Sequence, residues 1–529
     1  MARTLPPRHP GLPYIGDTVP LLTNTLAYVA AQRRRYGDLW GTQFIGQRAA
    51  VAIGAEAQRQ ILMNNAQFPA APGYEFVKPL LGHSLFDMDG DEHSRERRAM
   101  TPAFLNSQHA AYLTRLDDIL EKALSGWGNS GERVFYRDAL AVMFAFSCAI
   151  TIGIDTSPQA SAADQGFLRH WLAMQGGLLN PVRLDVVGSP WRRSLAARRW
   201  LERYLLNLIA QRRAAALSTA TPAAPTDMLD LLLQAQRARQ NGTTGIGAAP
   251  LSDRQIVDHI ILLLFAGYET TAGAVSWLLI ELLRQPPHIL ARVREEVHAD
   301  DHDAPTTLED IKNAPYLDAV IKETLRLHPA QHVSIRGVSA PWSYAGRVVP
   351  AGWSVMIAPM YTHRMPEYFA DPERFDPERF LPPREEDRAH PYALVEFGGG
   401  THACLGSGIA KLVMKAMVTK ALRRYELTLV PGQDFTPVFI PAGRPRGGAR
   451  IRYTQISWAP DVTGQETDLK RATDVRRMNH AGARLPRRGR DWPLLGVALV
   501  AGALAVALVV ILLKRRGVSS RHITRMPCV

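Results

Sequence analysis

One long apolar segment in the middle of the chain sets the strongest limit on its fold. Residues 253 to 285 are predicted to form a single helix: Ser252 and Gln255 have the spacing of a capping box at its start, and Pro286 stops its continuation. A helix of this length that is apolar over most of its surface has to be buried inside a large body. The segment therefore predicts a mainly helical core.

The centre of this helix carries polar groups that need an explanation. The run LLLFAGYETTAG, residues 262 to 273, places Glu269, Thr270 and Thr271 side by side. A buried polar group is costly unless it is hydrogen-bonded. A threonine can bond to the carbonyl four residues earlier and a glutamate can pair elsewhere, so a local explanation suffices for this run taken alone.

The rest of the body adds more helices and few strands. Helical periodicity covers about residues 308 to 328 and 405 to 425. The clearest strand signal is the run 346 to 359, where two β-prone stretches flank a Pro-Ala-Gly turn at 350 to 352, and it predicts a hairpin. Apolar residues make up 46% of the chain and charged residues 21%, as in folded globular proteins. We predict one mainly α domain with small β-sheets over residues 1 to 455.

The C-terminal segment has a different character. From Ala459 to Val529 there are 13 Lys or Arg against 5 Asp or Glu, a net of +8 out of the +13 of the whole chain. Residues 492 to 513 carry no charge, and as a helix they would be about 33 Å long, enough to cross a hydrocarbon core of about 30 Å. A basic tail beside an apolar span indicates anionic lipid rather than nucleic acid, for which no binding motif is present.

These patterns predict how the C-terminal part is organised. We expect a flexible basic linker at 456 to 490, a transmembrane anchor at 491 to 516 and a short basic tail at 517 to 529. A buried or interfacial helix is the alternative for the apolar span. Three cysteines are too few for a disulfide framework, and prolines interrupt the N-terminal sequence, so no secretory signal is expected. The predicted location is a membrane, with a single-pass C-terminal anchor and the main domain in the cytoplasm.

A glycine-rich loop that ends in a cysteine lies near the end of the main body. The run FGGGTHACLG, residues 397 to 406, has three consecutive glycines, which are tolerated where backbone turns sharply or approaches something closely. A helix predicted to open at Leu405 would place the sulfur of Cys404 near its N-terminus, where the dipole and free N–H groups favour a thiolate. Such a thiolate suits a soft metal, although a buried structural cysteine is equally compatible with the loop alone.

This loop resembles the haem-binding loop of the cytochrome P-450 monooxygenases. The matching residues are Phe397, Gly400, His402, Cys404 and Gly406. In that family the cysteine thiolate is the axial ligand of the haem iron. His402 replaces the arginine that is commonest at its position, which affects one contact to a haem propionate. The resemblance implies the cytochrome P-450 fold, haem b (iron protoporphyrin IX) as cofactor and Cys404 as the metal ligand.

A second motif, KETLRLHP, places Glu323 and Arg326 on one face of a helix. As an exposed pair they would contribute only about 0.2 to 0.5 kcal/mol. In the family the pair is buried with an arginine from a downstream PERF motif, which here is residues 377 to 380 and supplies Arg379. The resemblance implies a Glu-Arg-Arg network that supports the fold and haem retention.

A third motif, GDEHSRERRAMTPAF, is a basic run that could simply be a solvated helix face. It resembles the family helix that binds a haem propionate, and the matching residues are His93 and Arg97. Arg336 occupies the position of a second propionate-binding arginine. Because unpaired buried charge is expensive, two buried carboxylates need such cationic partners.

The same resemblance gives the central helix a function. Ala266, Gly267, Glu269 and Thr270 match the family helix that passes over the distal face of the haem. The two small residues are implied to leave space for dioxygen at the cofactor. Thr270 and Glu269 are the implied catalytic residues: Thr270 hydrogen-bonds dioxygen, and Glu269 with water relays the protons that cleavage of the O–O bond requires.

The motifs together cover about residues 1 to 455 and imply a monooxygenase. It would insert one oxygen atom from dioxygen into a lipophilic substrate of sterol, terpenoid, retinoid or fatty acyl type. No flavin or iron–sulfur motif is present, so electrons from NAD(P)H are expected through a separate ferredoxin or flavoprotein reductase. A basic surface near Lys411, Lys415 and Arg423 is expected to attract this partner.

Several expectations and alternatives accompany this hypothesis. We expect a monomer that binds the membrane through its C-terminal helix and binds no nucleic acid. Substrate access is expected to involve residues 68 to 85 and 166 to 208, the second of which is basic and amphipathic and could touch lipid headgroups. The alternatives are a peroxygenase driven by hydrogen peroxide and a non-catalytic haem-thiolate sensor or lipid-binding protein.

Overall fold

The computed structural model describes residues 4–12, 16–157, 159–178, 183–218, 225–240, 251–298, 305–440 and 442–456. The chain divides into two compact units, one with Met1–Leu179 and Asp185–Gln455 and the other with Asn180–Leu184 and Ile456–Val529. The helices and strands named below all belong to the first unit. The predicted linker, membrane anchor and basic tail lie in the second unit and, apart from Ile456, outside the described residues.

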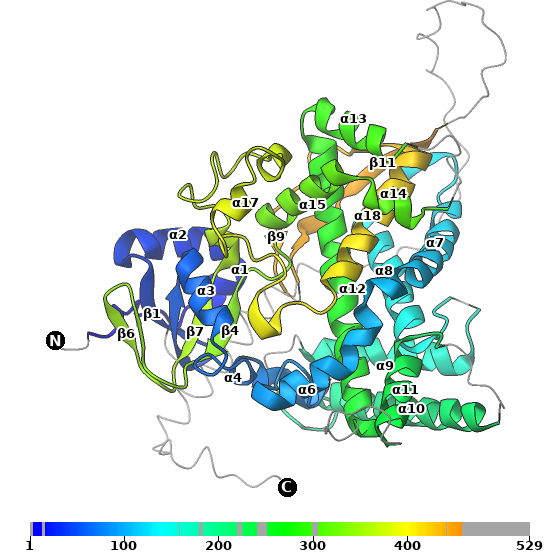
Figure 1. The fold of residues 1–529 in the computed structure, drawn as a ribbon, viewed down its shortest axis with the longest axis horizontal. Coiled ribbons are helices and arrows are strands. Elements are labelled where there is room, and N and C mark those ends of the chain that lie inside the picture. Colours follow the sequence, from blue (N-terminus) through cyan, green and yellow to red (C-terminus); the bar gives the residue numbers. More distant parts are fainter. Residues whose placement is uncertain are drawn as a thin grey trace, which may run out of the picture. The chain divides into compact units, whose positions relative to one another are not determined.

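Helices dominate the first unit, as predicted (Figure 1). The longer helices are α2 (Thr25–Tyr36), α3 (Ala55–Met63), α6 (Gly90–Met100), α7 (His109–Ser125), α8 (Phe135–Ile152), α9 (Ala162–Leu178), α10 (Pro190–Leu217), α11 (Met228–Gln240), α12 (Asp253–Arg284), α13 (Pro287–Glu296), α15 (Pro315–Leu327) and α18 (Ser407–Arg424). The shorter ones are α1 (Thr18–Thr23), α4 (Ala71–Tyr74), α5 (Lys78–Leu81), α14 (Leu308–Lys312), α16 (Pro359–Thr362) and α17 (Glu386–Ala389).

The central helix α12 has the predicted bounds. Its capping box is present: the Gln255 N–H donates to Ser252 Oγ, and the Ser252 N–H donates to Gln255 Oε1. The helix ends at Arg284, and Pro286 follows one residue after the cap Gln285. Apolar residues are buried around most of its circumference because it packs between α8, α15 and α18. The prediction of a buried core helix is confirmed.

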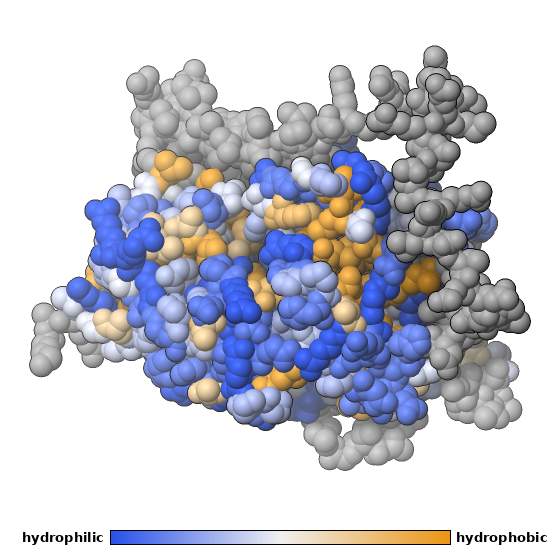
Figure 2. All heavy atoms as spheres, turned by 90° about the horizontal axis from the view of Figure 1, so that it is seen from above, coloured by the Kyte–Doolittle hydropathy of each residue, from blue (hydrophilic) through white to orange (hydrophobic). Residues whose placement is uncertain are grey.

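Two of the described helices, α8 and α12, are long and apolar enough to cross a membrane by length and composition alone. Most of the relevant stretch is buried inside the protein, 61% in α8 and 67% in α12, as is usual for core helices. On the face drawn in Figure 2, hydrophilic residues cover most of the described surface, and hydrophobic residues gather in smaller patches. The apolar faces of both helices are therefore explained by packing.

The strands of the described chain form four small sheets, of which the two larger flank the helices. The larger has the order β1-β2-β7-β4, with β2 parallel to β7 and the other neighbours antiparallel, and it lies beside α2 and α3 in Figure 1. The second has the order β3-β11-β8 and is antiparallel. Their strands are β1 (Leu39–Phe44), β2 (Gln47–Ala52), β3 (Ser130–Val134), β4 (Ser334–Gly337), β7 (Ser354–Ile357), β8 (Tyr425–Leu429) and β11 (Arg450–Gln455).

The predicted hairpin around residues 350 to 352 is wrong. The stretch before the turn is β6 (Arg347–Val349), which pairs with β5 (Trp342–Tyr344), whereas the stretch after it, β7, pairs with β2 and β4. The actual turn of the β5–β6 hairpin is Ala345-Gly346, where both residues have positive φ angles of 48° and 71°. Such a two-residue turn matches the twist of a hairpin, so it determines the pairing.

Two helix boundaries also differ from prediction. The segment predicted as one helix from 308 to 328 is two helices, α14 and α15, with Asn313 and Ala314 between them. Pro315 explains the break, because proline lacks an N–H and disfavours helical backbone in the residue before it. The helix after Cys404 begins at Ser407, two residues later than predicted.

Candidate functional site

The loop before α18 is shaped by its glycines. Gly398 and Gly400 have φ angles of 74° and 65°, in the left-handed region that favours glycine. A Cβ atom at Gly400 would lie 2.0 Å from the backbone oxygen of Leu62 in the last turn of α3. The loop then makes a short 3₁₀ turn at Gly400–His402 before it reaches Cys404. Glycine at 400 therefore permits a close approach between the loop and α3.

Cys404 has backbone partners on both sides. Its own N–H donates to the Phe397 carbonyl at 2.8 Å, and its sulfur receives a backbone hydrogen bond from Gly406. The Cys404 side chain is exposed, yet the protein atoms crowded around its sulfur desolvate the thiol and raise its pKa, while the Gly406 N–H and the positive charge of Arg97 oppose the rise. Because a coordinated metal deprotonates a thiol outright, this sulfur fits a metal ligand that becomes a thiolate on binding.

Basic side chains gather beside this cysteine. The His93 and His402 rings stack with their centroids 3.9 Å apart, and His402 Nε2 lies 3.3 Å from an Asp89 oxygen. The pKa of His93 is lowered to about 4 by burial and then by the charges of His402, Arg97 and Arg336. These effects place all four basic groups near one another, as the resemblance implies.

Arg97 and Arg336 give the clearest test of whether the residues fit a haem. Arg336 is 6% exposed, and its Nη1 donates only to neighbouring groups of its own strand, at 3.1 Å to the Ile335 carbonyl. Its Nε is buried without a partner, and among the described residues neither arginine has a carboxylate partner. Unpaired buried cations are costly. A cofactor with two carboxylates and a thiolate-binding metal would satisfy both arginines and Cys404.

Glu323, Arg326 and Arg379 form a fully buried network. Arg326 donates from Nε and Nη2 to the two oxygens of Glu323, at 2.6 and 2.8 Å, and Arg379 Nε donates to Glu323 Oε1 at 3.1 Å. All three side chains are 0% exposed. Glu323 Oε1 also accepts the Asp376 N–H at 2.8 Å, so the network holds the backbone that leads to the PERF turn at Pro377–Phe380.

His363 belongs to this network and was missed by the sequence analysis. Its Nδ1 donates to the Arg326 carbonyl at 3.2 Å, and its Nε2 accepts the Val395 N–H at 3.0 Å. Arg326 Nη1 in turn donates to the His363 carbonyl at 2.7 Å. Burial lowers the pKa of His363 to about 3, so the ring is neutral and can both donate and accept. Val395 precedes Phe397 by two residues, so His363 connects the network to the cysteine loop.

On α12, Thr270 and Glu269 have different environments. Thr270 Oγ1 donates to the Ala266 carbonyl at 2.7 Å, which is the local bond considered above. Glu269 Oε1 accepts from the Tyr268 hydroxyl at 3.2 Å, whereas its Oε2 is buried without a partner in the described part of the chain. Burial raises the pKa of Glu269, opposed by Tyr268 and by the charge of Arg444. A proton is therefore held more tightly at Glu269 than at an ordinary glutamate.

The small residues of α12 are accounted for in part by packing. A Cβ atom at Gly267 would lie 3.3 Å from Ser147 Oγ on α8, so glycine allows these helices to approach closely. A separate buried hydrogen bond joins α12 to α6, the helix that carries His93 and Arg97. His259 Nε2 lies 2.6 Å from Glu96 Oε2, and both side chains are 0% exposed. The helices with the predicted distal and basic groups are thus fixed to each other.

The predicted basic docking surface is wrong for two of its three residues. Lys415 is 5% exposed and donates to Asp318 and to the Ile311 carbonyl, each at 2.6 Å. Arg423 is 3% exposed and pairs with Asp310 at 3.1 Å. Both cations face inward because α18 packs its long side chains against acids of neighbouring helices. Lys411 is 40% exposed and lies 4.0 Å from Glu396.

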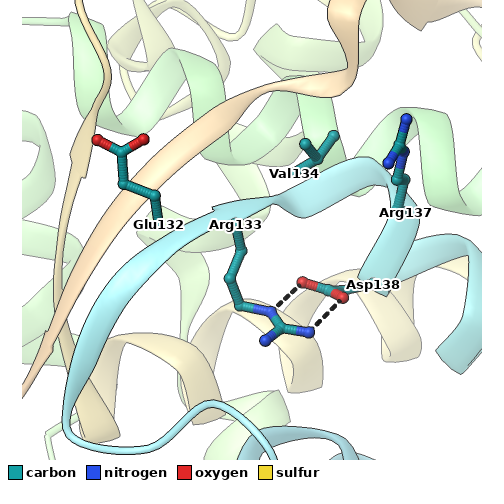
Figure 3. A pocket seen from close by; sticks show the side chains of 5 residues that line it. All are labelled: Glu132, Arg133, Val134, Arg137 and Asp138. Atoms are coloured by element: carbon teal, nitrogen blue, oxygen red, sulfur yellow. Dashed lines mark hydrogen bonds and ion pairs between the residues drawn. The ribbon is translucent and has the colours of Figure 1, made fainter. Parts of the chain in front are cut away.

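A shallow hollow at the junction of β3 and α8 is a different kind of site. The residues that line it are Glu132, Arg133, Val134, Arg137 and Asp138 (Figure 3). Arg133 Nε donates to Asp138 at 2.7 Å, and Glu132 accepts from Arg450 and Arg452 on β11. These paired charges fasten β3 to its neighbours, so the hollow is structural.

Comparisons with known proteins identify the family. The family model for cytochrome P450 matches residues 6–451, so the chain belongs to the cytochrome P450 family. A putative cytochrome P450 120 from Synechocystis sp. is 30% identical over 457 residues, 85% of this chain and 97% of that protein. A cyclooctat-9-en-7-ol 5-monooxygenase from Streptomyces melanosporofaciens is 30% identical over 80% of this chain and 89% of its own length.

A solved structure supports the fold. It is a cyanobacterial CYP120A1 with bound retinoic acid, 29% identical, with a TM-score of 0.75 over 86% of this chain and 100% of that chain. The predicted cytochrome P450 fold is confirmed for the body. Haem is the cofactor that the family implies, and the chain is an oxidoreductase of the monooxygenase class.

Proposed function

We propose that this protein is a haem-thiolate monooxygenase that inserts one oxygen atom from dioxygen into a lipophilic substrate. The observation that carries the proposal is the surroundings of Cys404: a backbone N–H on its sulfur and, among the basic groups gathered there, the half-buried Arg97 and the buried Arg336, neither of which has a carboxylate partner among the described residues. This combination suits an iron porphyrin with two acidic side chains. Bound haem would supply the oxidising iron centre, and the Cys404 thiolate would donate electron density to it.

The other residues are proposed to bind, hold and move protons around that centre. Arg97, Arg336, His93 and His402 hold the two carboxylates. The network of Glu323, Arg326 and Arg379 keeps the cysteine loop in place through buried charge-assisted hydrogen bonds.

Glu269 is proposed as the acid of the site. Its Oε2 has no partner in the described part of the chain, so a proton held there can pass to the substrate side, where Thr270, the next residue along the helix, supplies a hydroxyl. To donate its hydroxyl proton to another group, Thr270 has to break its hydrogen bond to the Ala266 carbonyl. The free-energy cost is that of one ordinary side-chain hydrogen bond within a helix.

For the substrate we propose a retinoid- or terpenoid-type molecule, within the wider group of sterol, terpenoid, retinoid and fatty acyl compounds. The support is similarity: the related solved structure binds retinoic acid, and one relative is named for the oxygenation of cyclooctat-9-en-7-ol. Purified haem protein should be screened for ligand-induced spin-state shifts. Retinoic acid should shift the spectrum, and a linear alkane sulfonate of similar length should not.

Electrons are proposed to come from NAD(P)H through a separate ferredoxin or flavoprotein reductase. The competing function is a peroxygenase. The two functions are distinguished by measuring product formation from a lipophilic substrate under two conditions. The first supplies NADPH with a surrogate ferredoxin and reductase, and the second supplies hydrogen peroxide alone. The proposal expects the first condition to be faster and to depend on Thr270, whereas equal or faster turnover with peroxide alone, independent of Thr270, contradicts it.

Membrane association is proposed to involve two parts of the chain. The span at 492 to 513 is the proposed single-pass anchor, with the enzyme body, a monomer, on the cytoplasmic side. The loop before α10 adds support from the described structure, because Val186 and Val187 are 56% and 86% exposed and are followed by the exposed arginines Arg192 and Arg193. Exposed apolar tips next to cations suit the boundary between lipid headgroups and acyl chains. Protease protection of sealed vesicles tests this orientation.

A further inference from the structure

The residue before the proposed acid is a tyrosine that contacts it directly. Tyr268 is 3% exposed, and its hydroxyl donates to Glu269 Oε1 at 3.2 Å. The second oxygen of Glu269, Oε2, is buried and has no partner in the described part of the chain. Tyr268 thus engages one carboxyl oxygen and leaves the other available.

The Tyr268 ring is held by aromatic neighbours from two other helices. Phe144 of α8 meets it edge to face with the ring centroids 5.4 Å apart at 74°. Trp171 of α9 meets it at 6.4 Å and 65°. Aromatic contacts of this kind favour one ring orientation, so the position of the hydroxyl is fixed by packing. The packing therefore fixes the Tyr268 hydroxyl, and this hydroxyl in turn fixes the position of the Glu269 side chain.

The outer side of the Tyr268 hydroxyl leads toward the protein surface. The polar side chain of Gln175, one turn after Trp171 on α9, lies near enough to the Tyr268 hydroxyl to lower its pKa, and this side chain is only half-buried. Gln175, Tyr268 and Glu269 consequently form a series of polar side chains from α9 to the centre of α12, in which Tyr268 and Glu269 are hydrogen-bonded. Burial, together with the charge of Glu269, raises the pKa of Tyr268, so the phenol stays neutral and its O–H remains a donor.

We infer that Tyr268 is a positioning residue that fixes Glu269 through Oε1 and relays protons to it from the α9 side of the protein. This inference rests on the proposed function, because it gives Glu269 its supply of protons. In one relay event, after Glu269 has given up its proton, the Tyr268 O–H proton moves to the Glu269 carboxylate while the Tyr268 oxygen takes a proton from a solvent hydronium at the α9 side, which becomes water. The net result is one proton transferred, with no change in the oxidation state of either residue.

The experiment compares two tyrosine variants of the full-length holoprotein. Tyr268→Phe removes the hydroxyl and keeps the ring that packs against α8 and α9. Tyr136→Phe is the matched control. Tyr136 is also half-buried, and burial and the charge of Glu269 raise its pKa. Within the described residues it makes no hydrogen bond to Glu269, and the Arg444 guanidinium lies 5.9 Å from its ring.

The first readout is the infrared carbonyl band of Glu269, recorded at a pH low enough to protonate this carboxyl group and assigned by its loss in Glu269→Gln. Tyr268→Phe should shift this band to higher frequency, because the carboxyl loses its hydrogen bond, and Tyr136→Phe should leave it in place. An unshifted band in Tyr268→Phe overturns the positioning role.

The second readout is dioxygen consumption with NADPH, a plant-type ferredoxin, its reductase and retinoic acid as the probe. Because general acid–base assistance is worth about 10²-fold or more and Glu269 remains, we expect about a tenfold slower consumption in Tyr268→Phe, with more of the dioxygen released as hydrogen peroxide. The double variant Tyr268→Phe/Glu269→Gln should be no slower than Glu269→Gln alone, since Tyr268 acts through Glu269.

The outcomes separate the inference from the proposed function. If the wild type has the spectrum of a thiolate haem and Tyr268→Phe consumes dioxygen at the wild-type rate, the relay is overturned and the monooxygenase proposal stands. If Tyr268→Phe does not retain haem, Gln175→Leu interrupts the same series from the surface of α9. A normal rate and peroxide yield in Gln175→Leu then overturns the relay, and a slower rate with more peroxide supports it.

Discussion

Arg336 is the single residue whose surroundings most clearly demand a ligand. It is buried, its Nε has no partner in the described part of the chain, and its hydrogen bonds stay within its own strand. Losing one partner of a buried ion pair costs about 3 kcal/mol, which is about 100-fold in affinity. We therefore expect Arg336→Met to weaken haem binding by about 100-fold, measured by haem transfer to excess apomyoglobin.

The same substitution should act in the opposite direction on the haem-free protein. Without haem the wild-type arginine is a buried charge with no anion, so Arg336→Met should raise the free energy of unfolding in urea. Arg347→Met, at an exposed position on β6, is the control and should change neither quantity. Equal haem transfer from Arg336→Met and wild type contradicts the assignment of Arg336 to the cofactor.

Buried histidines predict a dependence of stability on pH. Burial lowers the pKa of His363 to about 3 and that of His332 to about 4, whereas in the unfolded chain both are about 6.5. Between these values the unfolded state binds protons that the folded state does not. The free energy of unfolding therefore falls as the pH is lowered from about 6.5 towards 4, by up to about 1.4 kcal/mol per pH unit for each histidine.

A urea titration at several pH values between 7 and 4.5 measures this slope. His363→Gln should reduce it by up to about 1.4 kcal/mol per pH unit, because one of the protonation sites that produce the slope is lost. His288→Gln, at an exposed position on α13, is the matched control and should leave the slope as it is. A slope unchanged by His363→Gln means that His363 is not the buried neutral base described above.

Among the elements, α5, α10 and α12 meet at one buried ion pair. Arg198 of α10 donates to Asp258 of α12 and, from Nε, to the Leu80 carbonyl of α5 at 3.0 Å. Asp258 also accepts the His83 N–H at 3.0 Å. Asp258→Asn leaves the Arg198 cation without this anion, so we expect a loss of about 3 kcal/mol in stability, with faster hydrogen exchange in α10.

The control for this element is a surface pair at the start of the same helix. Asp185 lies 3.9 Å from Arg192, and both side chains are more than half exposed. Since exposed pairs contribute about 0 to 1 kcal/mol, Asp185→Asn should have little effect on either measurement. If Asp258→Asn is equally mild, the three elements are held by packing alone.

The elements also show where sequence reasoning succeeds. The bounds of α12 were predictable because a capping box and a proline are local signals within a few residues of each end. The pairing of β6 and β7 was not, since β7 pairs with β2, about 300 residues earlier in the chain. The break between α14 and α15 was visible in Pro315, which helical periodicity alone overlooks.

The candidate site divides in the same way. The cysteine loop and the Glu-x-x-Arg pair are contiguous motifs, so their residues could be chosen from the sequence. His363 could not, because its partners Arg326 and Val395 lie 37 and 32 residues away and its own neighbours form no motif that was recognised. The exposure of Lys415 and Arg423 was mispredicted because charge in a sequence says nothing about whether an acid on another helix pairs with it.

On the scale of the whole molecule, the family match ends at residue 451, and the basic and apolar tail follows. We predict that truncation after Ile456 moves the protein from the membrane pellet to the supernatant of lysed cells, while its haem spectrum stays that of the full chain. Full-length protein in the supernatant contradicts the anchor, and loss of haem on truncation contradicts an independently folded body.

The central claim for the whole molecule is that Cys404 binds the haem iron as a thiolate. It is tested most directly by the absorption spectrum of the reduced, carbon-monoxide-bound protein, recorded for the wild type and for Cys404→Ala. The wild type should show the strongly red-shifted Soret band of a thiolate haem, and Cys404→Ala should lack it. A wild type without that band, or a Cys404→Ala variant that keeps it, would contradict the account.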